Sequence, residues 1–287
     1  MESTGYKRRN QWGEVWYRLR KNWVAMVSLA VVAAIVILSV FSSWIAPYDY
    51  AKQDLGAVFQ MPGAEHWFGT DNLGRDIFSR VLVGGRVSLL VAVLALAIAT
   101  VIGCFMGVTA GYFGGRTDMI IMKLNDILMS IPQFLLAVSI SAALGSGIVN
   151  TALAVSISSI PRFARLMRAE VLTTKSKEFV EAARAFGAGN SRIILRHVIP
   201  NSMASTIINI SMSIGSSILA ISSLSFIGLG VQPPTPEWGS ILANGRAYIR
   251  DFWPLATFPG IAIIITLIAF NLLGDGLRDA MDPKLKR

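Results

Sequence analysis

The chain has 287 residues, of which 53% are hydrophobic and only 15% are charged, and its formal net charge is +9. A soluble domain of this length would leave much of that apolar surface in water, so the composition predicts a membrane protein. A basic excess can also indicate a nucleic-acid partner, but the placement of the charges argues against one.

Several apolar stretches are long enough to cross the hydrocarbon core as helices, which takes about 20 residues at about 1.5 Å rise per residue. The fold class is therefore predicted to be an all-α membrane protein with about six transmembrane helices. The apolar stretch at 127–161 is too long for one helix, and Gly145, Ser146 and Gly147 predict a turn within it. The predicted spans are 24–46, 87–110, 118–144, 149–166, 204–229 and 255–274.

The 26 Lys and Arg residues are unevenly distributed over the loops between these spans. Twenty fall on the side of the N-terminus and six on the other side. This positive-inside pattern places both termini in the cytoplasm. The chain is then divided into a cytoplasmic tail, a first helix, an extracytoplasmic segment, a transmembrane domain and a second cytoplasmic tail, at 1–22, 23–46, 47–85, 86–276 and 277–287.

The extracytoplasmic segment contains a turn region at 68–76, where Gly, Asn and Asp residues cluster. Apolar residues at helical spacing follow from Ile77. The region either caps a helix at the membrane surface or contacts a partner outside the membrane. Its candidate contact residues are Asp71, Asn72, Arg75 and Asp76.

The cytoplasmic loop at 167–203 is rich in Arg, Ala and Glu and predicts two short helices joined at Gly187. The first of these helices has an apolar face and a charged rim, which fits docking into a groove of another protein. The candidate contact residues of the loop are Glu178, Phe179, Glu181, Ala182, Ala183, Arg184, Phe186, Gly187 and Pro200.

The predicted span at 204–229 contains many serines, with glycines among them. Small hydroxyl residues allow close helix packing and can line a hydrated path, and both interpretations stay open here. The candidate pathway residues are Ser211, Ser216 and Ser222. Prolines hold the following loop, at 230–254, extended at the outer surface. Its candidate contact residues are Pro234, Pro236, Glu237 and Trp238.

The sequence contains no recognisable catalytic or metal-binding constellation. His66 and His197 fall on opposite sides of the predicted membrane, and the Gly-Lys dipeptide of a phosphate-binding loop is absent. We therefore expect a non-catalytic chain with no cofactor or metal of its own. Ionisable residues near the predicted membrane interior are limited to Lys123 and Asp126, whose spacing predicts a local ion pair.

The cytoplasmic loop resembles the EAA motif of ABC importer permeases. Glu181-Ala182-Ala183, Gly187 and the stretch His197-Val198-Ile199-Pro200 have the spacing of this motif, with His197 and Ile199 in place of its usual Ile and Leu. Further stretches resemble the second permease subunit of dipeptide, oligopeptide and nickel importers, at 68–76, 111–115, 233–239 and 273–284.

The resemblance implies a type I ABC importer permease fold in the cytoplasmic (inner) membrane of a bacterium or archaeon. Such a multi-pass subunit would form half of the pathway for di- or oligopeptides. The implied partners are membrane lipid, a homologous second permease in a heterodimer, an extracytoplasmic solute-binding protein, and two ATPase subunits that bind ATP and Mg. The EAA loop would dock on an ATPase, and the two outer loops on the binding protein.

The substrate stays open. Nickel, a metal chelate or glutathione are alternatives to peptides within the same family. An ion-coupled secondary transporter is the alternative from another class, and it would need carboxylates inside the membrane or helix breaks in matching halves.

Overall fold

The computed structural model describes residues 11–281, and these residues form helices and connecting loops without a strand. The ends of the two predicted cytoplasmic tails, at 1–10 and 282–287, lie outside the described residues. The prediction of an all-α fold is confirmed. The five longest helices are α2 (Trp23–Val40), α4 (Ile77–Phe113), α7 (Ile148–Lys175), α10 (Ile199–Phe226) and α12 (Pro254–Met281).

Shorter helices cap or connect the long ones. On the side of the chain termini and the EAA loop they are α1 (Gln11–Lys21), α5 (Gly115–Met129), α8 (Glu178–Ala185), α9 (Asn190–Ile193) and the π-helical turn η2 (Ile194–Val198), which runs into α10. The others are α3 (Ser42–Ile45), η1 (Leu55–Ala57), α6 (Gln133–Leu144), α11 (Trp238–Gly245) and η3 (Arg246–Tyr248).

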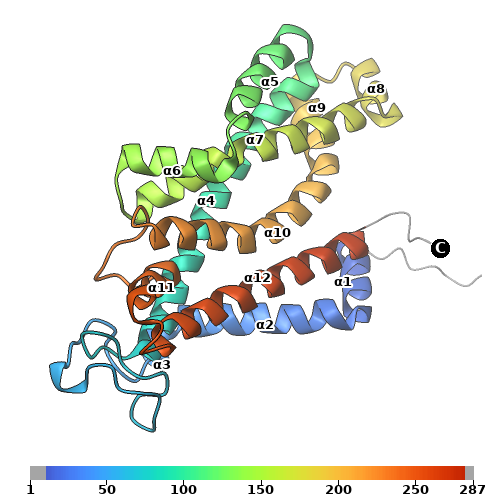
Figure 1. Ribbon diagram of the computed structural model, residues 1–287. Coiled ribbons are helices and arrows are strands. Elements are labelled where there is room, and N and C mark those ends of the chain that lie inside the picture. The colour runs from blue at the N-terminus through green and yellow to red at the C-terminus, as the bar shows by residue number, and fades with distance from the viewer. Residues whose placement is uncertain (1–10, 282–287) are drawn as a thin grey trace, which may run out of the picture.

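Helix α4 crosses the molecule and contacts both of its halves (Figure 1). In one half, α7 packs along α4, and α5 and α6 lie beside α7. In the other half, α2 and α12 pack on each other, and α10 lies between the two halves. The main buried core joins α4, α6, α7, α10, α11 and α12.

Four helical stretches are long and apolar enough to cross a membrane: α2, α4, the continuous stretch Asn190–Phe226, and α12. The pair α5 and α6 adds a fifth if it is counted as one broken span. Helix α7, which contains the predicted span at 149–166, is not among them, because its serines, Asn150 and Arg162 lower its hydropathy.

The predicted helix at 118–144 is two helices in the structure. Helices α5 and α6 are bent by 86° relative to each other across 130–132. Pro132 explains the break, since proline lacks the backbone N–H and disfavours helical geometry in the residue before it. The bend lays α6 against α7, where Gln133 Nε2 donates to Ser159 Oγ at 3.0 Å.

Four other helices extend beyond their predicted ends. Among them, α10 begins at Ile199 and not at 204, and α12 ends at Met281 and not at 274. Helix α4 begins at Ile77 and not at 87, because Asp76 caps it by accepting a hydrogen bond from Ser79 N at 2.7 Å. Helix α7 continues past 166 to Lys175, so the first part of the predicted cytoplasmic loop is helical.

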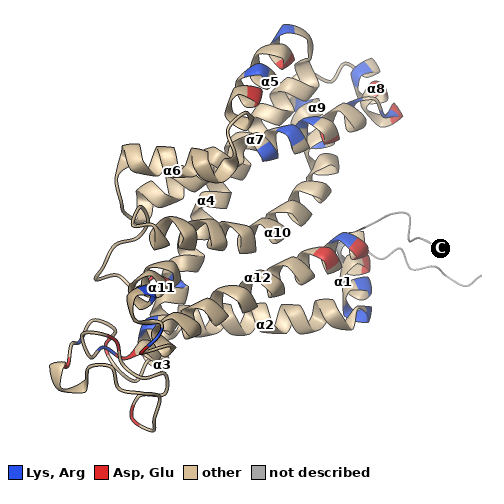
Figure 2. Cartoon of the chain, in the orientation of Figure 1, with Lys and Arg blue, Asp and Glu red and all other residues tan. Residues whose placement is uncertain are grey.

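Charged side chains gather at the two ends of the molecule, and the middle sections of α2, α4, α10 and α12 are free of them (Figure 2). Helix α7 differs, because Arg162, Arg165 and Arg168 lie at and just beyond its middle. One group lies at α1, α5, α8, α9 and the end of α12, and the other at α11 and the loop before α4. This arrangement agrees with helices that cross a membrane, while the orientation of the two ends stays a prediction.

Helices α4 and α7 approach closely because one face of α4 carries glycines four residues apart, at Gly103, Gly107 and Gly111. A Cβ atom at Gly107 would lie 2.4 Å from the carbonyl oxygen of Ala164, and one at Gly103 would lie 2.9 Å from that of Ile160. Neither contact leaves room for a side chain. Such small-residue faces allow membrane helices to pack backbone to backbone.

We expect Gly107→Ala to lower the apparent melting temperature of the detergent-solubilised protein by a few degrees. Overpacking costs about 1–3 kcal/mol, which offsets or exceeds the helix-propensity gain of about 1 kcal/mol from replacing glycine. The measurement is a thermal unfolding scan of both proteins.

The matched control is Gly260→Ala in α12, where the added Cβ would meet only Leu242 Cδ1 at 3.6 Å. This variant should keep or raise the melting temperature. Equal melting temperatures for the two variants would contradict the role assigned to the glycine face of α4.

Candidate functional site

Helix α8, which carries the first part of the EAA loop, is anchored on a buried apolar cluster. Val180 is completely buried there, together with Val171, Ile193 and Val198. Burial of one such side chain contributes about 1.5–3 kcal/mol. Because these residues come from α7, α8, α9 and η2, the cluster attaches α8 at one defined position.

The opposite side of α8 is exposed. Phe186 is 91% exposed and Phe179 is 40% exposed, although both are large and apolar. Of the other predicted contact residues, Ala183 is half-buried, and those at the surface are Glu178, Glu181, Ala182, Arg184, Gly187 and Pro200. The structure therefore presents the predicted residues together on a surface, but the residue that anchors the helix is Val180, which the sequence pattern did not single out.

Gly187 ends α8 in a Schellman motif. Its φ is +77°, its N–H donates to Arg184 O at 3.0 Å, and the N–H of Ala188 donates to Ala183 O at 3.0 Å. Left-handed helical geometry costs about 1–2 kcal/mol for residues with a Cβ. The direction in which the chain leaves α8 therefore depends on glycine at this position.

Polar contacts attach the segments on either side of α8 to α4. Lys175 Nζ donates to Gly111 O at 2.6 Å, and Tyr112 Oη donates to Asn190 Oδ1 at 2.9 Å. The end of α7 and the start of α9, which flank α8, are thus both joined to α4.

The predicted ion pair between Lys123 and Asp126 is not formed among the described residues. Asp126 Oδ1 accepts from Arg165 Nη2 at 2.7 Å, and Asp118 pairs with Arg168 at 2.5 Å. Both contacts join α5 to α7. A rule based on the spacing of residues within one helix does not predict ion-pair partners from another helix.

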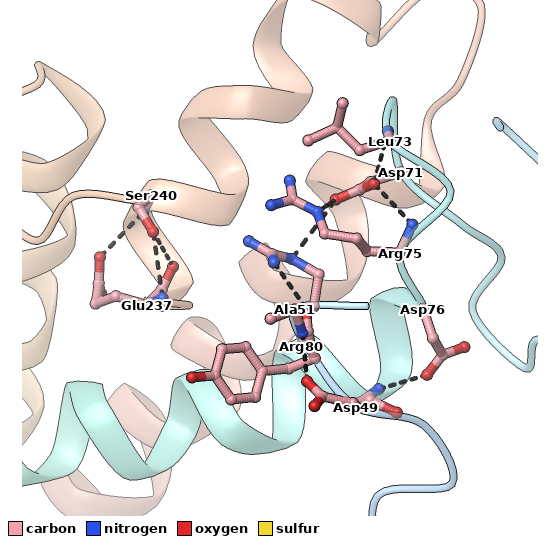
Figure 3. A network of polar contacts seen from close by, with 11 residues as sticks. Asp49, Ala51, Asp71, Leu73, Arg75, Asp76, Arg80, Glu237 and Ser240 are labelled. Atoms are coloured by element: carbon pink, nitrogen blue, oxygen red, sulfur yellow. Dashed lines mark hydrogen bonds and ion pairs between the residues drawn. The ribbon is translucent and has the colours of Figure 1, made fainter. Parts of the chain in front are cut away.

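The predicted contact residues of the outer segment lie mostly inside it (Figure 3). Asp71 accepts hydrogen bonds from Leu73 N at 2.9 Å, Arg75 N at 3.0 Å and Arg75 Nε at 2.7 Å. Asp76 caps α4, and its Oδ1 atom also lies within hydrogen-bond distance, 2.9 Å, of His66 Nδ1. Asp71, Arg75 and Asp76 are buried because they fold the loop.

Glu237 is also fully buried and joins three helices at the outer end of the molecule. Its carboxylate accepts from the backbone N–H groups of Gly239 and Ser240 at 3.0 Å each, which caps α11 (Figure 3). It also accepts from Ser88 Oγ of α4 at 3.0 Å and Ser222 Oγ of α10 at 3.1 Å. Four donors therefore converge on one carboxylate.

The prediction of a docking surface in the two outer loops is thus corrected for six of its eight residues. Their side chains are buried, and a partner cannot reach them in this conformation: Asp71, Arg75, Asp76, Pro236, Glu237 and Trp238. Asn72 is half-buried and Pro234 is exposed, so docking at these two residues stays a prediction.

A polar pocket of about 320 Å³ lies between α4, α6, α7 and α10. Of the three predicted pathway serines, Ser216 lines it, whereas Ser211 and Ser222 do not. Ser222 is instead bound to Glu237. Polar lining residues beyond the three named candidates are Gln133, Ser158, Ser159, Arg162, Ser213, Ser217 and Ser223.

The sequence already places part of this lining on one helix. Ser158, Ser159 and Arg162 are one and four residues apart, which places them on adjoining faces of a single helix. Gln133 joins them only through the bend at 130–132. Within residues 11–281, no group of three or more side chains is arranged to hold a metal ion.

Two protein families match the sequence. Residues 99–287 match the family described as the binding-protein-dependent transport system inner membrane component. Residues 10–62 match the N-terminal TM domain of oligopeptide transport permease C.

Named relatives match almost the whole chain. The glutathione transport system permease protein GsiD of Escherichia coli O6:K15:H31 (strain 536 / UPEC) is 48% identical over 279 residues, which cover 97% of this chain and 92% of that protein. The GsiD protein of Shigella dysenteriae serotype 1 (strain Sd197) is 47% identical over 279 residues, with the same coverage of both chains.

Solved structures share the fold at low sequence identity. A chain of the MetNI methionine ABC transporter in an inward-facing conformation aligns with a TM-score of 0.58 and 16% identity, over 71% of this chain and 97% of that chain. A chain of an amino acid ABC transporter aligns with a TM-score of 0.53 and 15% identity, over 70% of this chain and 94% of that chain.

Glu237→Ala is expected to lower the apparent melting temperature in detergent, because it leaves buried donors on three helices without an acceptor. An unpaired buried donor costs about 1–3 kcal/mol. Limited proteolysis of the loop at 230–254 should accelerate in parallel. Glu65→Ala removes an exposed acid from the outer loop and is the control that should change neither property. An unchanged melting temperature in Glu237→Ala would refute the joining role of this carboxylate.

Proposed function

This chain belongs to the inner-membrane components of binding-protein-dependent transport systems, the permease subunits of ABC importers, and we propose that it carries short peptides, glutathione among them. It is a non-catalytic transmembrane subunit, and its family implies ABC ATPase and binding-protein partners. The substrate proposal is supported by the 48% identity to a glutathione permease, which extends over 97% of this chain. Glutathione is itself a tripeptide.

The observation that carries the coupling mechanism is the exposed side of α8. Phe186 is an apolar side chain with almost no contact inside the chain, and Glu181 and Arg184 flank it with charges of both signs. A groove on an ATPase subunit would bury the ring and pair with these charges. Because Val180 attaches α8 to α7, closure of the ATPases on ATP would move α7 and α10 and shift the pathway between its two open states.

We further propose that a homologous second permease completes the pathway. The polar pocket opens to the outside of the chain at Gln133 and Ser216, both of which are exposed. Exposed polar groups at membrane depth require water or another polar surface. A second permease facing this side would enclose a hydrated path between the two chains.

The solute-binding protein is proposed to contact the outer loops. Apolar side chains remain exposed there, with Leu55 at 75% and Met61 at 54%, close in sequence to the buried network around Asp71. Pro234 is exposed in the other loop. Exposed apolar groups on a loop held by buried ion pairs suit a rigid docking surface.

The substrate proposal is tested by uptake into proteoliposomes that contain this chain with its second permease, ATPases and binding protein. We expect ATP-dependent accumulation of radiolabelled glutathione or of a labelled dipeptide, and competition by the other peptide. Ni²⁺ uptake is measured in parallel. Uptake of Ni²⁺ without uptake of either peptide would reject the proposal and favour the metal alternative.

Coupling through α8 is tested with Phe186→Ala. The side chain is exposed, so the variant should fold normally, while the ATPase stimulation by loaded binding protein should fall about tenfold or more, as expected for loss of a central aromatic contact. The control is Phe113→Ala, which removes another exposed phenylalanine from the end of α4. Normal stimulation in Phe186→Ala, or an equal loss in Phe113→Ala, would argue against docking at α8.

A further inference from the structure

Three arginines follow one another at three-residue spacing on α7, and only the first lacks an acidic partner. Arg165 pairs with Asp126 and Arg168 pairs with Asp118. Arg162 Nη2 donates to the neutral amide oxygen of Asn209 at 3.3 Å, and within residues 11–281 no Asp or Glu lies in ion-pair contact with it. Its charge is therefore held in position but not neutralised.

Arg162 lines the polar pocket, in which the other polar groups are neutral. They are amide and hydroxyl groups from three helices, including Gln133 of α6, Ser159 of α7 and Ser216 of α10. Ser213 lines the same pocket, and its buried hydroxyl has no hydrogen-bond partner within the described residues. The pocket therefore combines hydrogen-bonding groups and one positive charge with apolar lining residues such as Leu96, Phe134 and Phe163.

A second pocket, of about 380 Å³, has the opposite character. It lies among α4, α7, η2 and α10, and its lining is apolar except for Cys104 and Thr109. Val101, Phe105 and Leu195 in this lining are each about 70% exposed, as suits a surface covered by lipid or by another apolar chain. The chain thus has one apolar pocket and one polar pocket. Of these two, only the polar pocket has groups that can bind a charged solute.

We propose that Arg162 binds the carboxylate of the solute while it passes through the polar pocket. The inference rests on the proposed function, since peptides and glutathione all carry a free carboxylate. A guanidinium group binds a carboxylate through two parallel hydrogen bonds, and the neighbouring hydroxyl and amide groups hydrogen-bond the rest of a peptide. Arg162 lies towards the inner end of the predicted span at 149–166, so its charge attracts the carboxylate towards the cytoplasmic side.

The first test is chemical labelling of single cysteines in the assembled complex in nanodiscs, and it does not depend on the identity of the solute. Cys104 is the only cysteine of this chain and lines the apolar pocket, so it should not react with charged methanethiosulfonates. In Cys104→Ala/Ser216→Cys the new thiol lies in the polar pocket and should react. An anionic reagent should react faster than a cationic one, and Arg162→Gln should reduce this preference about tenfold.

An unreactive cysteine at 216 would overturn the proposal, because the pocket would then be closed by protein in the complex. A preference that Arg162→Gln does not change would overturn it as well. Arg165→Gln is the matched control, since it removes the same charge three residues further along α7 from a residue that does not line the pocket. An equal effect of Arg165→Gln would mean that the preference for the anionic reagent comes from the overall charge of α7, and it would overturn the role of Arg162.

The second test compares transport of a dipeptide with that of its C-terminally amidated form. Arg162→Gln should lower uptake of the free-acid dipeptide about tenfold relative to the amide, as expected for loss of a charge-assisted hydrogen bond. Arg162→Lys should restore part of the difference. Equal losses for acid and amide would reject carboxylate binding by Arg162.

The two tests separate this inference from the proposed function. If the wild-type complex transports neither glutathione nor a dipeptide, the substrate proposal fails in the uptake assay. The labelling preference at Ser216→Cys then still decides whether Arg162 provides an accessible positive charge in the pocket.

Discussion

The close contact between α4 and α7 positions both regions that we propose to be functional in this permease. Gly103, Gly107 and Gly111 leave no side chain between the two backbones, so α7 lies at one distance and in one orientation along α4. Its first half carries the polar pocket, and its second half leads directly into α8. A displacement of α8 would therefore reach the pocket through α7, which packs against α4 along its length.

The outer end is held by a different kind of interaction. Glu237 accepts hydrogen bonds from α4, α10 and α11, so a buried carboxylate joins elements that are more than 100 residues apart in the chain. A buried charge is tolerated when hydrogen bonds satisfy it, and removing its partners is costly. The same principle applies to Asp71 and Asp76, whose buried carboxylates accept hydrogen bonds that stabilise the loop before α4.

The polarity of α7 follows from its place in the molecule. A helix that faces lipid on all sides would not tolerate Asn150, several serines and Arg162, since unsatisfied polar groups are costly in hydrocarbon. In α7 these groups face α6, α10 and the polar pocket, whereas the glycine face of α4 covers the opposite side. The low hydropathy of α7 therefore agrees with its contacts to α6, α10 and the polar pocket.

The sequence by itself determined the helical class, the positions of most long helices, the absence of a phosphate-binding loop and the place of the EAA-like loop at 178–187. These features depend on runs of apolar residues and on short motifs, which are local properties of the chain. The break at Pro132 is also local, but the long apolar run around it outweighed the proline in the prediction. Tertiary structure alone decided that Val180 is buried while Phe186 is exposed, and that Asp126 pairs with Arg165. It likewise decided that Ser222 binds Glu237 while Ser216 lines the pocket, because burial and pairing depend on neighbours contributed by distant helices.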